Sequence, residues 1–147
     1  LEEIIKSFSE SYITLINLDT SKDYNKISIN KIPEIIFGIR NFVGNAAKFA
    51  NKKVLINLSS NSKNILINIT DDGPGFPEDV IDILGEPYIK SKSKNIKKKS
   101  GLGLGTFLGK TLLERNGANV DFENKGNLGG ASVKINWKVE NFNKLIS

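Results

Sequence analysis

The sequence predicts an α+β fold of two layers, in which a mixed, mostly antiparallel sheet of about five strands is covered on one face by about three helices. Two observations lead to this fold class. Short runs of alternating apolar residues, typical of strands that turn one face to a core, recur along the chain. Longer stretches with apolar residues three and four positions apart, typical of amphipathic helices, lie between them. The 147 residues suffice for one domain with its own core.

The composition narrows the classes of function. With 39% apolar and 25% charged residues, it is that of an ordinary globular domain. Cysteine is absent, which removes disulfides and thiolate chemistry. Histidine is absent too, which excludes a Ser-His-Asp triad, a histidine base and nearly all zinc sites within the chain. Because the chain starts at Leu1 and holds no methionine, we expect it to be a fragment of a longer protein.

The net charge of +5 comes from one segment. Residues 89–100 contain six lysines and no acidic residue. Removing those six from the 21 basic residues leaves 15, against 16 acidic residues, so the remainder of the chain is close to neutral. We therefore expect no nucleic-acid partner, which would need a wider basic surface. Like charges with little to bury instead favour a mobile loop whose natural ligand is an anion.

The first fifty residues alternate between the two kinds of element. Residues 1–9 carry an apolar stripe and are predicted as a short helix. Residues 13–18 have a strand pattern, and residues 27–29 have a brief second one. Pro33, which fits the first turn of a helix, opens a long helix that runs to about Ala50.

The predicted helix 33–50 has two different faces. Its apolar side is wide enough for a core. That side consists of Ile32, Ile35, Ile36, Ile39, Phe42, Val43, Ala46 and Ala47. The opposite row, made of Gly38, Asn41, Asn45 and Lys48, falls within about 80° at 100° per residue. A solvated face usually carries Glu and Lys, since Asn is a poorer helix former. The row is therefore more typical of a ligand-binding surface than of a solvated one.

A carboxylate follows the second of the next two strands. These strands are predicted at residues 53–59 and 65–70, and Asp71 continues the isoleucine-bearing face of the second. The carboxylate therefore lies at the rim of the core, where it needs hydrogen-bond donors. Gly73 and Gly75, just beyond, let the backbone approach a ligand closely.

The Asp72-Gly73 pair is also typical of a two-residue hairpin turn, so this stretch alone leaves both a ligand site and a plain turn open. A hairpin needs a second strand, whereas Pro77 and the acidic residues after it are typical of a helix start. That short helix is predicted to end at Leu84, before Gly85. The lysine-rich loop comes next, and long loops within compact domains are often lids.

A glycine-rich turn, Gly101-Leu102-Gly103-Leu104-Gly105, is predicted to lead from the loop into a helix. Free backbone N–H groups and the helix dipole at such a start favour an anion. The later Gly109-Lys110-Thr111 resembles the end of a P-loop, but the glycine required five residues earlier is Leu104. Strands predicted at residues 119–124 and 131–138 complete the fold.

In this order the motifs resemble the ATP-binding domain of sensor histidine kinases, whose fold also serves DNA gyrase, the mismatch-repair ATPases and the ninety-kilodalton heat-shock chaperone. The shared pattern is an Asn-x-x-x-Asn helix, Asp-x-Gly-x-Gly after a strand, a lid and Gly-x-Gly-x-Gly, and it extends from about Ile13 to Trp137. The sequence is most similar to the RegB/PrrB type, which comprises membrane-anchored, redox-responsive kinases. The segments that carry this closer resemblance are 71–77, 84–88, 101–105 and 111–115.

The resemblance implies ATP and Mg²⁺ as cofactors and a role for each motif. Asp71 would accept a hydrogen bond from the adenine amino group and select ATP over GTP, whose carbonyl would oppose acceptor to acceptor. Asn45 would be the metal ligand through its amide oxygen. Asn41, Asn45 and Lys48 would be the catalytic residues. The implied ATP-binding residues are Asn41, Asn45, Lys48, Phe49, Asp71, Gly73, Gly75, Phe76, Tyr88, Lys92, Gly101, Leu102, Gly103, Leu104 and Gly105.

Within this resemblance, Asn41 separates phosphate transfer from hydrolysis. Hydrolysing relatives carry a glutamate at that place, whereas an amide cannot serve as a base for water. The γ-phosphate would be kept for transfer to a histidine, mostly through positioning and charge neutralisation. Because the chain lacks that histidine, residues 1–12 are expected to be a connector from an upstream dimerisation domain, and residues 13–147 the catalytic domain. The implied partners are that domain, a response regulator and a second copy in a homodimer, in the cytoplasm below an inner-membrane anchor.

Two other functions are considered beside this one. The first is a stand-alone serine kinase of the anti-sigma-factor type, which has a similar fold and size. The second is a module that binds nucleotide as a signal and transfers nothing. The presence of Asn45, Asp71 and all three glycines of the 101–105 segment argues against the second.

Overall fold

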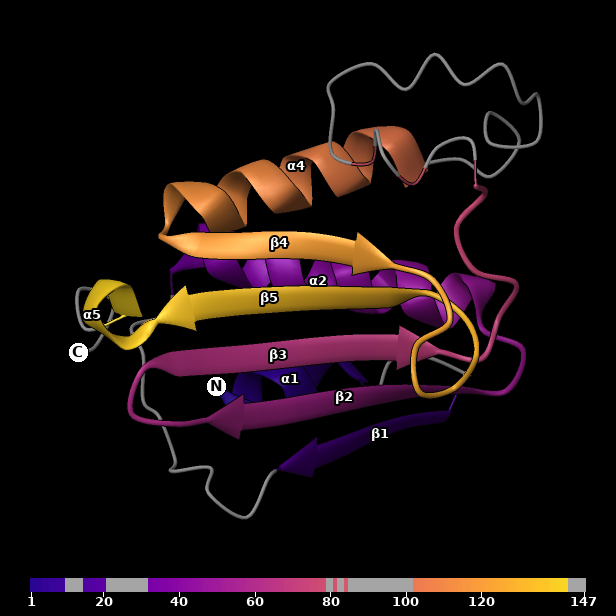
Figure 1. Ribbon diagram of the computed structural model, residues 1–147, viewed down its shortest axis with the longest axis horizontal. Coiled ribbons are helices and arrows are strands. Elements are labelled where there is room, and N and C mark those ends of the chain that lie inside the picture. Colours follow the sequence, from indigo (N-terminus) through magenta and orange to yellow (C-terminus); the bar gives the residue numbers. More distant parts are fainter. Residues whose placement is uncertain (10–14, 21–31, 79–80, 82–83, 85–101, 143–147) are drawn as a thin grey trace.

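The molecule is a five-stranded sheet with helices packed on one face (Figure 1). The structure is a computed structural model, and it describes residues 1–9, 15–20, 32–78, 81, 84 and 102–142. The strands are β1 (Leu15–Thr20), β2 (Lys53–Ser60), β3 (Asn64–Asp71), β4 (Ala118–Glu123) and β5 (Ser132–Lys138). The helices of the described residues are α1 (Glu2–Ser9), α2 (Pro33–Phe49), α4 (Leu102–Arg115) and α5 (Val139–Phe142).

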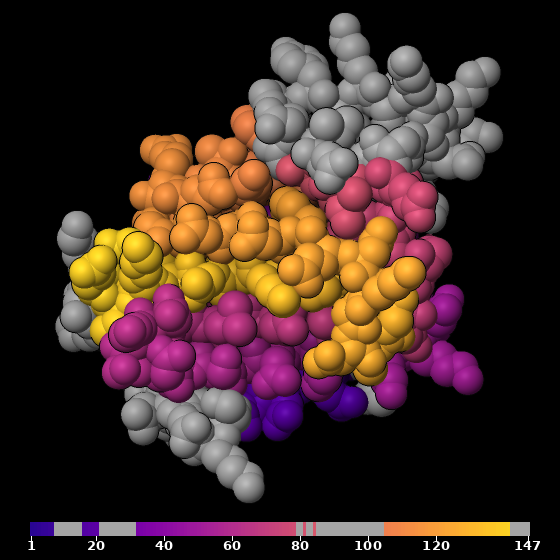
Figure 2. All heavy atoms as spheres, viewed as in Figure 1, coloured from indigo at the N-terminus to yellow at the C-terminus, as the bar shows by residue number. Residues whose placement is uncertain are grey.

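The strand order in the sheet is β1-β2-β3-β5-β4. Strands β1 and β2 are parallel, and the chain crosses between them through α2, as a parallel pair requires. The other three pairings are antiparallel. The predicted mixed, mostly antiparallel sheet is therefore confirmed. Figure 2 shows the face of this sheet that the helices leave uncovered.

The helices α1 and α2 lie behind the sheet in Figure 1, and α4 packs against α2 beside β4. The predicted layer of about three helices is confirmed, and the four-residue α5 is an addition at the end of β5. Helix α2 begins at Pro33, as predicted, because the fixed φ of proline suits the first helical position. None of the described helices is long and apolar enough to cross a membrane.

Close packing between α2 and α4 corrects one expectation. Gly38 was predicted to belong to the ligand-binding row of α2, but it is buried against α4. A Cβ at Gly38 would lie 2.7 Å from Cγ of Leu113, and one at Gly109 would lie 3.1 Å from the ring of Phe42. Glycine at these two positions therefore lets the helices approach, and Gly38 serves packing rather than ligand contact.

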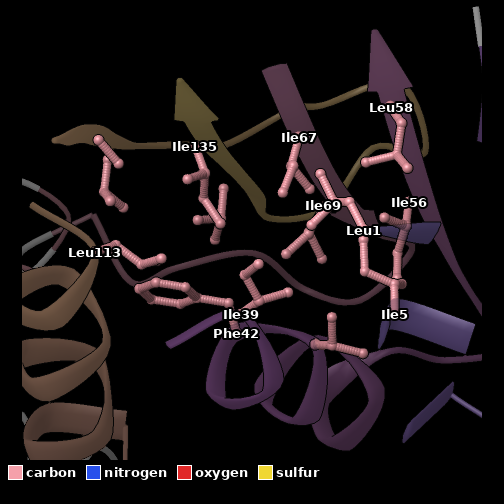
Figure 3. Close-up of a cluster of buried hydrophobic side chains, with 14 of the residues drawn as sticks. Leu1, Ile5, Ile39, Phe42, Ile56, Leu58, Ile67, Ile69, Leu113 and Ile135 are labelled. Atoms are coloured by element: carbon pink, nitrogen blue, oxygen red, sulfur yellow. The ribbon is translucent and has the colours of Figure 1, made fainter. Parts of the chain in front are cut away.

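A single apolar core joins the sheet and the helices (Figure 3). Apolar side chains of α2 meet the inward-facing residues of β2, β3 and β5, and Phe42 lies beside Leu113 of α4. Leu1, just before α1, and Ile5 of α1 are buried in the same cluster, so the first helix is anchored to the core. That residues 1–12 connect to an upstream domain stays a prediction.

Several expectations lie outside the described residues. They include the brief strand at 27–29, most of the helix at 77–84, the lysine-rich loop at 89–100, and the candidate site residues Tyr88, Lys92 and Gly101. Within the predicted helix, the N–H group of Ile81 donates to the carbonyl of Pro77 at 3.1 Å. These residues are four positions apart, as in the hydrogen bonds of an α-helix.

Candidate functional site

Asp71 ends β3 at the rim of the core, as predicted. Its side chain is 3% exposed, and its neighbour on the same strand face, Ile69, is 1% exposed. The carboxylate Oδ1 accepts hydrogen bonds from the backbone N–H groups of Gly73 at 2.9 Å and Ala131 at 3.3 Å. All hydrogen bonds that the carboxylate accepts from described residues go to Oδ1. The second oxygen, Oδ2, therefore accepts no hydrogen bond from the described residues.

Burial raises the pKa of the Asp71 carboxyl group above its ordinary value. The two backbone hydrogen bonds from Gly73 and Ala131 oppose this shift, and the negative charge of Asp72 adds to it. A buried carboxylate with an oxygen facing a cavity gains most from a ligand that donates a hydrogen bond. The local electrostatics thus favour a donor at Oδ2.

Asp71 faces a cavity between the sheet and the two long helices. Its volume is about 700 Å³, the open mouth included. The walls are mostly apolar, and the few polar side chains are those of Asn45, Asp71 and Thr106. The lining residues are Phe42, Asn45, Ala46, Phe49, Ile69, Asp71, Gly75, Phe76, Pro77, Thr106, Phe122, Ala131 and Val133. An apolar pocket with a few convergent polar groups is the usual form of a small-molecule site.

Three phenylalanine rings form a continuous aromatic wall of this cavity. The ring of Phe122, on β4, meets that of Phe42 edge to face with centroids 5.7 Å apart. It meets the ring of Phe76 in the same way at 5.8 Å. Such contacts fix ring orientations, so the cavity presents a rigid apolar slot of a kind that suits a flat ring system.

The glycines after Asp71 allow the loop to lie directly against α2. A Cβ at Gly73 would be 2.2 Å from the carbonyl oxygen of Phe49, the last residue of the helix. Gly75 has a left-handed φ of 83°, which a side chain would strain. The backbone does pack closely here, but the partner of Gly73 is the end of α2, so close approach to a ligand stays a prediction.

Replacing Gly73 by alanine is expected to destabilise the fold by about 3 kcal/mol, because the new methyl group would meet backbone that cannot rotate away. Gly129→Ala is the comparison without a clash: its φ of 86° is left-handed, but no atom lies within 4 Å of the added Cβ. That change should cost about 1 kcal/mol from backbone strain alone. Urea unfolding measures both, and a Gly73 variant no less stable than the Gly129 variant would contradict this packing.

Asp72 was not predicted as a site residue, but it ties the loop to the turn that joins α2 to β2. Its Oδ1 accepts the backbone N–H groups of Asn51 at 2.8 Å and Lys52 at 3.0 Å, with that of Lys53 at 3.2 Å. The side-chain amide of Asn51 donates in return to the Asp72 carbonyl at 2.8 Å. These hydrogen bonds, that of Lys52 above all, hold the pKa of Asp72 below its ordinary value.

Asn41 and Asn45 lie on α2 at two different places. Asn45 lines the main cavity and also a shallower hollow on the outer side of α2, with Phe37, Arg40, Asn41 and Gly44. The Asn41 amide donates to the carbonyl of Gly105 at 2.9 Å and so holds α4 to α2. Lys48 is exposed, with its Nζ 5.5 Å from the centre of the Phe49 ring.

The structure therefore brings some of the predicted residues together and separates others. Asn45, Phe49, Asp71, Gly75 and Phe76 share the main cavity. The predicted turn before the second long helix is corrected: α4 already begins at Leu102, so residues 102–105 form its first turn. Asn41 packs against Gly105 of that turn, where an added Cβ would lie 2.8 Å from its Oδ1.

Further cavity residues were not predicted. Thr106 is 1% exposed and lines the cavity one position after Gly105. Phe122, on β4, and Ala131, just before β5, also line it. Asn124 and Gly130, in the loop between these strands, do not line the cavity but bind Phe76 and Asp71, respectively. The apolar alternation of β4 gave a signal for Phe122, but nothing local to the others indicated that the loop between β4 and β5 returns to Asp71.

The sequence matches the Histidine kinase-, DNA gyrase B-, and HSP90-like ATPase family over residues 31–141, which is most of the chain. The chain belongs to this family. The resemblance to sensor histidine kinases that the motifs suggested is confirmed by the relatives of this ATPase domain. The sensor histidine kinase RegB of Cereibacter sphaeroides is 35% identical, and the match covers 74% of this chain and 27% of RegB. The sensor protein KdpD of Clostridium acetobutylicum is 32% identical over 67% of this chain and 11% of its own length.

Solved structures show the same fold. The ATP-binding domain of PrrB from Mycobacterium tuberculosis matches with a TM-score of 0.65 at 21% identity, covering 91% of this chain and 87% of that one. The catalytic domain of the histidine kinase ThkA matches with a TM-score of 0.72 at 17% identity, covering 93% and 92%. The match with RegB, in contrast, spans about a quarter of the length of that protein.

The oxygen-bearing side chains at the cavity fit a magnesium ion that arrives with a nucleotide. Magnesium takes oxygen ligands and is commonly held by few protein groups together with substrate phosphates and water. Among the described residues, no group of three or more His, Cys, Asp or Glu side chains could hold a metal ion by itself. Asn45 places one amide side chain at the cavity. A single amide oxygen is a suitable protein ligand for an ion that is otherwise bound by phosphates.

Proposed function

We propose that this domain binds ATP with magnesium and transfers the γ-phosphate to a histidine on a separate dimerisation domain, for relay to a response regulator. The observation that carries the proposal is Asp71, a buried carboxylate that lines an apolar cavity and accepts its hydrogen bonds from described residues through Oδ1 alone. The adenine amino group is the donor from which Oδ2 would accept a hydrogen bond. Guanine, with a carbonyl in that place, would leave two acceptors opposed.

The remaining cavity residues take roles along the same nucleotide. Phe49 and Phe76 would enclose the base, and Asn45 would hold the magnesium ion. Magnesium would neutralise phosphate charge and align the nucleotide for transfer. Lys48 is exposed beside Phe49, and its ammonium group would serve as a point charge for the phosphates. Tyr88, Lys92 and Gly101 would complete the nucleotide site from the lid.

Asn41 supports transfer rather than hydrolysis. It lies one helical turn before Asn45, and both residues line the hollow on the outer side of α2. An amide does not deprotonate water, and the Asn41 amide already donates to Gly105. An incoming histidine, which needs no base to be a nucleophile when neutral, would meet the γ-phosphate instead.

The relatives also favour this function over a stand-alone serine kinase, since those that match include the sensor histidine kinase RegB and the sensor protein KdpD. We therefore propose that the domain works within a longer, dimeric and membrane-anchored sensor protein. Its partners would be the upstream dimerisation domain and a response regulator.

Phosphate transfer in trans tests the proposal. The domain is incubated with Mg²⁺ and ATP labelled at the γ-phosphate, together with a separate helical-pair segment that carries the acceptor histidine. Because this chain contains no histidine, histidine-bound label, which is stable in base and labile in acid, must lie on the acceptor. We expect such label to appear only when both proteins and Mg²⁺ are present. Nucleotide binding without any transfer would support the signalling-module alternative and overturn the kinase assignment.

A further inference from the structure

Asn124, directly after β4, pairs with both backbone groups of Phe76 through its side-chain amide. Its Oδ1 accepts the Phe76 N–H group at 2.7 Å, and its Nδ2 donates to the Phe76 carbonyl at 2.7 Å. The two residues are 48 positions apart in the sequence. An amide side chain that pairs with both groups of one residue imitates a strand partner and fixes that residue in position and orientation.

The residue held in this way forms a wall of the nucleotide cavity. Phe76 lines the cavity, and its ring packs edge to face on Phe122, which lies on the strand that Asn124 follows. Asn124 also touches Gly75: a Cβ there would lie 2.7 Å from Oδ1 of Asn124. The amide therefore sets how close the segment 75–76 can come to the sheet.

The loop that carries Asn124 is itself joined to Asp71. The Gly130 N–H group donates to the Asp71 carbonyl at 3.1 Å, and the Ala131 N–H group donates to its Oδ1. A Cβ at Gly130 would lie 2.5 Å from the Asp71 carbonyl oxygen. Lys125, beside Asn124, adopts a left-handed φ of 56°, a conformation that persists where surrounding contacts hold it. In Figures 1 and 2 this orange-to-yellow loop lies against the end of β3.

We propose that Asn124 is a positioning residue for base selection, a role that rests on the proposed binding of ATP. Asp71 can tell an amino group from a carbonyl only if the base is held at one depth. The loop after β4 carries both constraints: its end is fixed to Asp71, and Asn124 fixes Phe76 in the cavity wall. With Phe76 released, the base can shift by a fraction of an ångström, and the hydrogen bond to Asp71 weakens.

Asn124→Asp isolates the donor half of the amide pair. The aspartate keeps an oxygen for the Phe76 N–H group but turns a second oxygen toward the Phe76 carbonyl. We expect the affinities for ATP and ADP to fall together by about tenfold, the worth of a buried hydrogen bond. Affinity for GTP, measured by competition, should change little, so selection of ATP over GTP falls by the same factor. Asn119→Asp, at an exposed position of β4, is the matched control and should leave all affinities unchanged.

The ratio of ATP to GTP affinity separates positioning from a general structural role, because lost stability alone lowers both affinities in proportion. An unchanged ratio in the folded Asn124→Asp variant would overturn the inference. If that variant does not fold, Asn124→Ser, which is smaller and keeps a donor, takes its place with the same criterion. Should the unsubstituted domain bind neither nucleotide, the proposed function fails, and the inference falls with it. Selective binding by the unsubstituted domain with an unchanged ratio in the variant refutes the inference alone.

Discussion

Replacing Asp71 by asparagine should weaken ATP binding by about 10- to 100-fold. Asparagine keeps an oxygen for the N–H groups of Gly73 and Ala131, but it turns an NH₂ group toward the adenine amino group. A buried hydrogen bond to a charged group is worth about 1.5–3 kcal/mol, which corresponds to this loss. Selection against GTP should also disappear, because the new donor matches the guanine carbonyl. Titration calorimetry with both nucleotides measures the change.

Asp121→Asn is the control for this experiment, since it removes the same charge from an exposed position on β4. It should bind ATP as the unsubstituted domain does. If the Asp71→Asn variant keeps its affinity for ATP and its selection of ATP over GTP, the proposed role of Asp71 is wrong, whatever the effect on phosphate transfer.

The same variant has an expected pH signature in thermal stability. Burial raises the pKa of Asp71, so the folded state holds its proton at pH values where the unfolded state has lost it. The free energy of unfolding therefore falls as the pH rises from the ordinary pKa of 3.8 through the raised pKa of the folded state. At higher pH it stays at the lower level. Asp71→Asn should melt at a higher temperature than the unsubstituted domain at neutral pH. This advantage should vanish below pH 3.8, and an advantage that grows on acidification would contradict it.

Replacing Asn45 by alanine should lower phosphate transfer by about 100-fold. The change removes the amide that we propose as the protein ligand of magnesium, and a misplaced phosphate loses a factor of this order. The magnesium-dependent part of ATP affinity should be lost, while binding measured with a chelator present should change by less than about twofold. Transfer assays and calorimetry with and without Mg²⁺ separate the two contributions.

Asn119→Ala serves as the comparison for Asn45, because it removes an asparagine side chain from an exposed strand position far from the cavity in the sheet register. It should not alter transfer or the effect of magnesium. Full transfer by the Asn45 variant would show that the metal is bound without this residue.

Much of the candidate site could be predicted because its residues are close in sequence and lie on regular elements. Alternation along β3 placed Asp71 at the rim of the core, and the 3.6-residue period placed Asn45 opposite the apolar side of α2. For Gly38 the same reasoning gave a wrong prediction. The helical period placed Gly38 in the correct row of α2, but a glycine on a helix face allows a close helix contact as readily as it lines a ligand site.

The start of α4 and the loop after β4 could not be predicted for a different reason. Leucine and glycine in residues 102–105 carry no strong local preference for a turn over a first helical turn, and packing of Gly105 on Asn41 accompanies the helical form. Asn124 has no periodicity that points to Phe76, since their contact depends on two distant segments returning to the same edge of the sheet.

By itself the sequence determined the fold class, the family and the position of the buried carboxylate that we propose reads the base, because periodicity and motif spacing are local properties of the chain. Only the tertiary structure decided what holds that carboxylate and its loop in place. Ala131, Asp72 and Asn124 act through hydrogen bonds between segments that are distant in sequence. Such bonds form only when the sheet brings the segments together, so no local pattern encodes them.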